Sequence, residues 1–183
     1  MNGEVLIDIA KRSIALEFGL DSKIDIQELE KRYPKLKDKR ATFVTLTIDG
    51  QLRGCIGSII PYRSLLNDLI SNAKSASFND PRFPPLTLEE FKNVKVEVSL
   101  LSVPNLLEYT NIDDLKDKIR PMIDGVILQC DGKQATFLPQ VWEQLNSFDL
   151  FFSHLCLKAG LLQDCLKSHP DIFVYQVEKF KEN

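Results

Sequence analysis

Two Asp-Gly pairs, each set between two short runs of strand-forming residues, constrain the fold of this sequence more than any other feature. Asp49-Gly50 joins ATFVTLTI to QLRGCIGS, and Asp131-Gly132 joins GVILQC to KQATFL. Asp-Gly favours the two-residue turn with positive φ angles that connects neighbouring antiparallel strands. The two pairs therefore predict two β-hairpins. Their flanking residues do not align, so the likeness is turn chemistry and not an internal repeat.

Helical patterns surround the two predicted hairpins. Apolar residues recur at helical spacing over residues 3–18, 61–78 and 148–159, and each run predicts an amphipathic helix. A further short helix is predicted after Asp25, because Glu28 lies where the partner of a capping residue belongs. We expect the helix over 61–78 to open at its leading proline.

Two further segments alternate between apolar and polar residues and predict strands, namely VKVEVSLL (94–101) and IFVYQVEKF (172–180). Between the predicted elements, NDPRFPPLT holds three prolines in nine residues, which excludes a regular element there. This order of helices and strands predicts an α+β fold with a mainly antiparallel sheet and flanking helices. We expect a single domain over 1–183, with a helical part at 1–40 and a sheet-bearing part at 41–183.

Composition narrows the function classes. The net charge of −3 argues against a nucleic-acid-binding protein, and no apolar run approaches the roughly 18 residues of a membrane span. The first residues do not form a signal peptide, so we expect a cytoplasmic protein. The four cysteines, Cys55, Cys130, Cys156 and Cys165, form no C-x-x-C pair and no zinc spacing. We therefore expect reduced thiols, no metal and no cofactor.

Four motifs occur in a fixed order along the chain: LRGCIG (52–57), DPRFPPL (80–86), EVSLL (97–101) and TFLPQVWEQ (136–144). Together they resemble the AMME chromosomal region protein family, whose prokaryotic members are known as AmmeMemoRadiSam system protein A. The resemblance covers about Ala41 to Gly160 and departs from the family at Ala135, where many members have glycine. It implies an α+β fold with a larger and a smaller part and a cleft between them. It also implies association with Memo-like and radical-SAM proteins, but no established activity.

Cys55 is the sharpest candidate for chemistry. A thiolate is a nucleophile, and Arg53, two residues away, would favour the charged form. Gly54 and Gly57 would let a ligand approach the backbone. The alternative is a small buried residue between two glycines at a tight helix–sheet contact, which is where free cysteine is most often found.

Four other motif residues are candidates for ligand binding or proton transfer, namely Asp80, Arg82, Glu97 and Gln140. Arg82 lies on a proline-stiffened loop and could bind an anion, or pair with an acid such as Glu97 while Asp80 caps the loop. Glu97 is a general base if its strand face lines the cleft and a polar surface residue if it does not. Gln140 lies beside Trp142 and could help to hold a planar ligand, although a lone tryptophan is usually core.

Two functions therefore stay open at this stage. In the first, a cleft holds a small molecule, Cys55 acts as nucleophile or redox group, and Glu97 moves a proton while Arg53 and Arg82 bind an anionic group. In the second, the chain is a non-catalytic module that recognises a Memo-like or radical-SAM protein. A fold alone does not decide between them.

Overall fold

The computed structural model describes residues 3–182, which divide into two compact units. Unit 1 comprises residues 3–101 and 178–182, and unit 2 comprises residues 102–177. Each unit has its own four-stranded sheet and its own hydrophobic core. The predicted α+β class is confirmed. The predicted division after residue 40 lies inside unit 1, and the predicted cleft stays a prediction.

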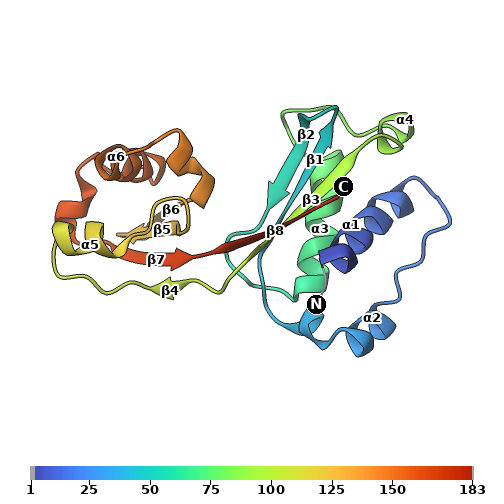
Figure 1. The fold of residues 1–183 in the computed structure, drawn as a ribbon, viewed down its shortest axis with the longest axis horizontal. Helices are drawn as coiled ribbons and strands as arrows, with labels where there is room; N and C mark the ends of the chain where they lie inside the picture. The colour runs from blue at the N-terminus through green and yellow to red at the C-terminus, as the bar shows by residue number, and fades with distance from the viewer. Residues whose placement is uncertain (1–2, 183) are drawn as a thin grey trace. The chain divides into compact units, whose positions relative to one another are not determined.

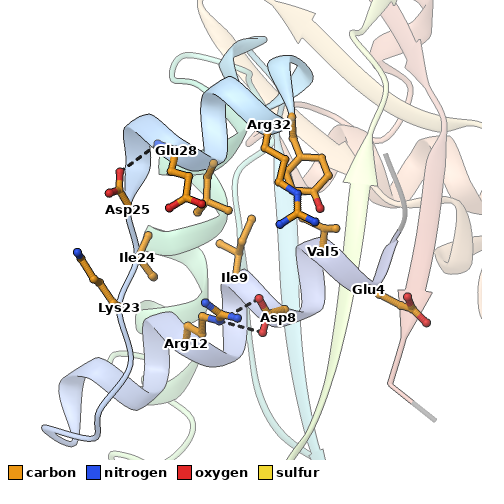
Figure 2. A pocket seen from close by; sticks show the side chains of 12 residues that line it. Glu4, Val5, Asp8, Ile9, Arg12, Lys23, Ile24, Asp25, Glu28 and Arg32 are labelled. Atoms are coloured by element: carbon orange, nitrogen blue, oxygen red, sulfur yellow. Dashed lines mark hydrogen bonds and ion pairs between the residues drawn. The ribbon is translucent and has the colours of Figure 1, made fainter.

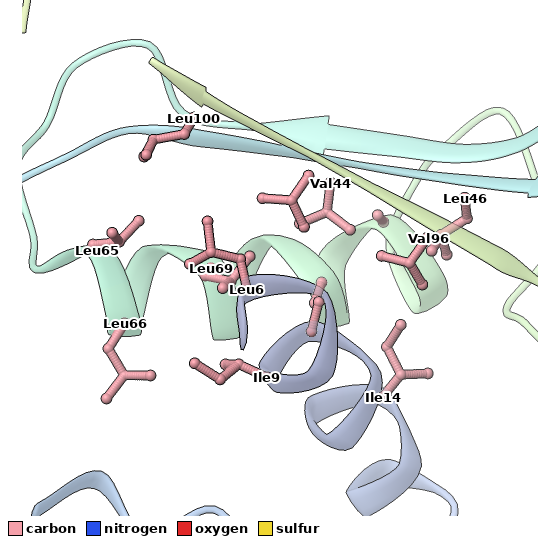
Figure 3. Close-up of a cluster of buried hydrophobic side chains, with 14 of the residues drawn as sticks. Leu6, Ile9, Ile14, Val44, Leu46, Leu65, Leu66, Leu69, Val96 and Leu100 are labelled. Carbon is pink, nitrogen blue, oxygen red and sulfur yellow. The ribbon is translucent and has the colours of Figure 1, made fainter. Parts of the chain in front are cut away.

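Unit 1 is a sheet covered on one face by two helices. Its strands have the order β2-β1-β3-β8, and they are β1 (Thr42–Ile48), β2 (Gln51–Gly57), β3 (Lys95–Leu101) and β8 (Val177–Lys181). Helix α3 (Leu65–Phe78) packs against β1 and β2, and α1 (Gly3–Glu17) packs against α3 and β3, as Figure 1 shows. Apolar residues of β1 and β3, including Val44, Leu46 and Val96, meet Leu6 and Leu69 in this core (Figure 3).

Short elements complete unit 1, namely α2 (Ile26–Arg32), the 3-10 helix η1 (Pro34–Lys37) and α4 (Leu88–Phe91). The Asp25 side chain accepts a hydrogen bond from the backbone N–H of Glu28, so the predicted cap of α2 is confirmed. The predicted start of α3 at Pro61 is wrong. Helix α3 begins at Leu65, because the Ser64 side chain caps it and ends the preceding loop.

Both predicted hairpins are confirmed, and their turns are alike. Asp49 and Gly50 have φ angles of 51° and 76°, and Asp131 and Gly132 have φ angles of 50° and 75°. Two successive positive φ angles define the turn that matches the twist of antiparallel strands.

The β1–β2 pairing contains a β-bulge. Leu46 lies opposite Gly54, but the next residue, Thr47, lies opposite Leu52. Arg53 is therefore the extra residue on β2. A bulge bends the strand and re-aims the side chain of the extra residue, so Arg53 and Cys55 do not follow the simple alternation of a regular hairpin.

Unit 2 is a second antiparallel sheet covered by one helix. Its strands have the order β4-β7-β5-β6, and they are β4 (Asn105–Leu106), β5 (Gly125–Cys130), β6 (Lys133–Phe137) and β7 (Asp171–Tyr175). Its helices are α5 (Ile112–Lys118), η2 (Pro139–Glu143), α6 (Phe148–Lys158) and η3 (Cys165–Ser168). Ser147 caps α6 and Gly160, with a φ of 74°, follows its end, as predicted. The sequence did not predict α5, in which only Leu115 is buried.

The last predicted strand is wrong in one respect. Residues 172–180 form two strands, β7 and β8, which belong to different sheets. Gln176 separates them, because its N–H and carbonyl bond to the side chain and backbone of Ser102 and not to a neighbouring strand. Alternation alone could not reveal this change of sheet.

The expectation that all cysteines are reduced is also wrong. Cys156 of α6 and Cys165 of η3 form a disulfide, with their Cα atoms 5.8 Å apart. Both lie in the core of unit 2, whereas Cys55 and Cys130 are free. The turn after α6 brings the pair together, and spacing along the chain does not report that proximity.

Candidate functional site

The DPRFPPL loop holds the backbone of Cys55 on both sides. The Cys55 N–H donates to Asp80 Oδ2 at 2.9 Å, and the Cys55 carbonyl accepts from Arg82 Nη2 at 3.1 Å. On the neighbouring strand, Thr45 Oγ1 lies 3.2 Å from Cys55 Sγ, within hydrogen-bond distance. Cys55 itself is half-buried, so its thiol is fixed without being sealed in the core.

Asp80 and Arg82 form a compact clamp at the start of this loop. Arg82 donates to Asp80 through its backbone N–H, through Nε at 2.9 Å and through Nη2 at 2.7 Å. The Asp80 side chain is 2% exposed and that of Arg82 is 53% exposed. The hydrogen bond from Arg82, aided by those from the backbone, outweighs burial and holds the pKa of Asp80 well below its usual value.

The charge of Arg82 is set mainly by its contact with Asp80. The Asp80 carboxylate raises the pKa of Arg82 most, and Cys55 adds a smaller contribution in the same direction. The sequence suggested Glu97 as the acid that pairs with Arg82. In the structure the partner of Arg82 is Asp80. More than half of the Arg82 side chain still faces solvent, which leaves it able to meet an anionic group.

Arg53, the bulge residue, is held in a more buried setting. It donates to Glu90 through Nε at 2.8 Å and Nη2 at 3.0 Å, and to the carbonyl of Pro84 at 3.0 Å. Its side chain is only 11% exposed. The bond from Arg53 lowers the pKa of Glu90 to about 2. The guanidinium carbons of Arg53 and Arg82 lie 5.7 and 5.6 Å from the centre of the Phe83 ring, which joins the two arginines.

Packing accounts for both glycines of LRGCIG. A Cβ atom on Gly54 would collide with the carbonyl oxygen of Ala76 in α3. A Cβ atom on Gly57 would collide with the ring of Phe43 on β1. Neither glycine needs a bound ligand to explain it. This agrees with the alternative considered from the sequence, in which the glycines allow close packing.

Glu97 lies on the same sheet face as Cys55. Thr45 of β1 is the register partner of Cys55 on β2 and of Glu97 on β3, so the three side chains form a row on the face opposite α3. Two strand spacings place the Cα atoms of Cys55 and Glu97 about 10 Å apart. Glu97 makes an ion pair of 2.9 Å with Lys181, whose side chain is 69% exposed.

Gln140 belongs to unit 2, whereas Cys55, Arg82 and Glu97 belong to unit 1. It is exposed at the start of η2, where Pro139 fixes the turn. Trp142 is buried and stacks on Phe151, with ring centres 3.8 Å apart. The tryptophan is therefore a core residue, and nothing in unit 2 gives Gln140 a ligand-binding partner.

Sequence reasoning missed a buried polar cluster at the other end of the sheet. Asp68 of α3 accepts from Thr42, Ser58, Arg63 and Asn72, and its side chain is 1% exposed. Asp68 and Asn72 are four residues apart on the face of α3 that was predicted to be apolar. These two polar residues in a predicted apolar face were the signal that could have revealed the cluster, because a buried carboxylate needs hydrogen-bond partners. The cluster is fully bonded and ties α3 to β1.

Within the described part of the chain, no group of three or more His, Cys, Asp and Glu side chains could hold a metal ion. No helix between residues 3 and 182 is both long and apolar enough to cross a membrane. The region around Cys55 therefore offers a thiol, an exposed guanidinium and a carboxylate as its chemical groups.

The motifs and the fold agree with one family. Residues 7–180 match the AMMECR1 family. The chain belongs to this family. A protein of Methanopyrus kandleri is 37% identical, covering 98% of this chain and 88% of the relative, and one of Nanoarchaeum equitans is 36% identical, covering 97% and 99%. The crystal structure of an uncharacterized protein from Pyrococcus horikoshii matches with a TM-score of 0.82 and 34% identity, over 99% of this AMMECR1 chain and 91% of that one.

Proposed function

We propose that this AMMECR1 protein binds an anionic small molecule on the outer face of the unit 1 sheet, beside Cys55. The observation that carries the proposal is the half-buried Cys55, whose backbone carbonyl accepts a hydrogen bond of 3.1 Å from the exposed guanidinium of Arg82. Arg82 would bind a carboxylate or phosphate group, because its guanidinium matches planar anions. Arg53 is too buried for direct contact and would support Phe83 and the loop.

A thiol-assisted reaction is the chemistry that suits this arrangement. The Cys55 sulfur would add to a carbonyl carbon of the ligand, so that the S–C bond forms as the carbon–oxygen π bond breaks and its electron pair moves to the oxygen. The thiol proton would pass to solvent, and the carbonyl oxygen would take up a proton in return. Glu97 lies about 10 Å away across Thr45, so it would exchange a proton with the far end of the ligand and not with the thiol itself. The exposed ion pair with Lys181 leaves Glu97 free to do so, because surface pairs are weak.

A non-catalytic function is the second candidate. Asp80 and Glu90 are fully engaged by Arg82 and Arg53, and both have a lowered pKa, so neither is poised to act as a base near pH 7. The exposed Arg82 would then bind an acidic protein surface. In this case the protein is a cytoplasmic module that docks on a Memo-like or radical-SAM partner, as the family resemblance implies.

Charge-selective alkylation tests the first proposal. Cys55 and Cys130 are the two free thiols, and Cys130 lies 3.7 Å from the acidic Asp131 side chain. We expect the ratio of iodoacetate to iodoacetamide labelling rates to be about fivefold higher at Cys55 than at Cys130, because a cation attracts the charged reagent. Peptide mass spectrometry measures both rates in the same sample. Arg82→Gln should lower the ratio at Cys55 and leave the ratio at Cys130 unchanged, and Arg82→Lys should lower the Cys55 ratio less.

Equal ratios at the two cysteines would contradict an anion site beside Cys55. The partner-binding alternative predicts a different pair of results. Cys55→Ser would keep a co-purifying Memo-like or radical-SAM protein, whereas Arg82→Glu would lose it. Loss of the partner with Cys55→Ser alone would count against a purely non-catalytic module.

A further inference from the structure

A groove in unit 1 lies away from every motif of the sequence. Helix α1 forms one wall, and residues 23–33, which include α2, form the other (Figure 2). Its volume is about 460 Å³, within the range of small-molecule sites. None of its lining residues lies near Cys55 in the sequence or takes part in the contacts of the DPRFPPL loop.

The groove has an apolar floor. Val5 and Ile9 of α1 line it together with Ile24 and Leu29 of the opposite wall. Helix α2 has no buried residue, so its wall rests on half-buried side chains and leaves the groove open to solvent. An open groove with this floor would take an aliphatic side chain of a ligand.

Helix α2 presents two unpaired charges of opposite sign to the groove, and Lys23 adds a further cation before the helix. Glu28 and Arg32 are four residues apart on one face of α2, a spacing that usually produces an ion pair. They form none, and the guanidinium carbon of Arg32 lies 5.4 Å from the Tyr33 ring centre instead. Within residues 3–182 neither side chain has an ion-pair partner, and both line the groove.

Among the other lining charges within residues 3–182, Lys23 has no ion-pair partner, and the remaining ones are engaged. Arg12 pairs with Asp8 on the α1 wall at 2.9 Å, and the Asp25 carboxylate caps α2. Glu28 and Arg32 thus provide the one acid and one base on α2 that can meet a ligand. Their Cβ atoms are about 6 Å apart by helix geometry, which is comparable to the separation of the two ends of a dipeptide.

We propose that this groove binds a short zwitterionic peptide with apolar side chains. Glu28 binds the terminal ammonium, Arg32 binds the terminal carboxylate, and the half-buried Val5 and Ile24 contact the side chains. The two charged contacts give orientation, and the apolar floor supplies burial. The inference is independent of Cys55 and its chemistry.

Titration calorimetry with the full chain and the dipeptide Leu-Leu tests the proposal. We expect binding, together with chemical-shift changes for α1 and residues 23–33 in the amide spectrum. The acetylated and amidated dipeptide, which lacks both charges, should bind at least about tenfold more weakly. Arg32→Gln and Glu28→Gln should each weaken binding of Leu-Leu by about tenfold.

Lys31→Gln is the matched control, because Lys31 is an exposed neighbour on α2 that does not line the groove. It should leave binding unchanged. Absence of binding at millimolar Leu-Leu, equal affinity for the blocked dipeptide, or equal losses in all three variants would each overturn the proposal. All three substituted proteins can be compared as folded chains, since α2 contributes no buried residue.

Discussion

The two Asp-Gly hairpins share a turn but differ in how their strands pair. In β5–β6 the register is regular from Val126 opposite Phe137 to Cys130 opposite Lys133. In β1–β2 the same kind of turn leads into a bulge at Arg53. The turn therefore determines where each hairpin lies in the sequence. The irregular strand, β2, also has contacts with segments outside its own hairpin. For β2 those contacts come from α3 and from the DPRFPPL loop.

Among substitutions that test this difference between the hairpins, Gly54→Ala should have the largest effect on stability. The added methyl group would meet the backbone carbonyl of Ala76, which cannot rotate away as a side chain can. We expect a loss of about 3 kcal/mol in the free energy of unfolding, measured by urea denaturation. Ala135→Gly in the regular hairpin is the control and should cost only about 1 kcal/mol. Similar losses for both would show that α3 does not press on β2.

Asp80→Asn should have the next largest effect. It removes the charge that accepts bonds from Arg82 and from the Cys55 N–H, and we expect a loss of about 2 kcal/mol. Alkylation of Cys55 should also become faster, because the strand loses its tie to the loop. Asp124→Asn is the control, because Arg120 clamps Asp124 in the same way within unit 2. That variant should leave the Cys55 rate unchanged, and an equal increase would contradict a local clamp.

Acid should weaken the bulged hairpin by a smaller amount. The folded pKa values of Asp80 and Glu90 lie below their unfolded values of 3.8 and 4.5, so their stabilisation is fully present above about pH 5.5 and is lost progressively as pH falls. We expect these two groups to contribute about 1.5 kcal/mol of the loss between about pH 5 and pH 3, after allowance for the partial exposure of Glu90. Urea midpoints at each pH measure it. In the variant Asp80→Asn/Glu90→Gln the urea midpoint should depend less steeply on pH. An unchanged dependence would show that these carboxylates do not cause the loss of stability in acid.

The smallest effect should be the same in both hairpins. Gly50→Ala and Gly132→Ala place a Cβ atom in open space, but at φ angles of 76° and 75°. Each should cost about 1 kcal/mol, because only the backbone conformation is strained. Thermal unfolding of the two variants compares them directly. A clear difference between them would mean that the two turns are not equivalent.

Sequence patterns predicted the features that depend on neighbouring residues. The two turns, the cap at Asp25 and the limits of α6 at Ser147 and Gly160 all rest on contacts within a few positions. The errors concern contacts between distant segments. The disulfide joining Cys156 to Cys165 and the change of sheet at Gln176 depend on tertiary packing, which a local pattern does not contain.

The candidate site shows the same division. The motifs identified Cys55 and Arg82, which do lie together in unit 1. They did not identify Asp80 as the partner of Arg82, because two acids were available and only the folded loop decides between them. Nor could they identify Thr45, an ordinary strand threonine whose importance comes from its register with Cys55 and Glu97.

The position of β8 has a consequence for how the protein is made. Strand β8 completes the sheet of unit 1, yet it is encoded after the whole of unit 2. During synthesis the edge of β3 must therefore stay unpaired until residues 177–181 leave the ribosome. An unpaired edge invites pairing with other chains. The nascent protein is thus most exposed to aggregation while the ribosome translates residues 102–177, and a pause in that stretch would prolong the hazard.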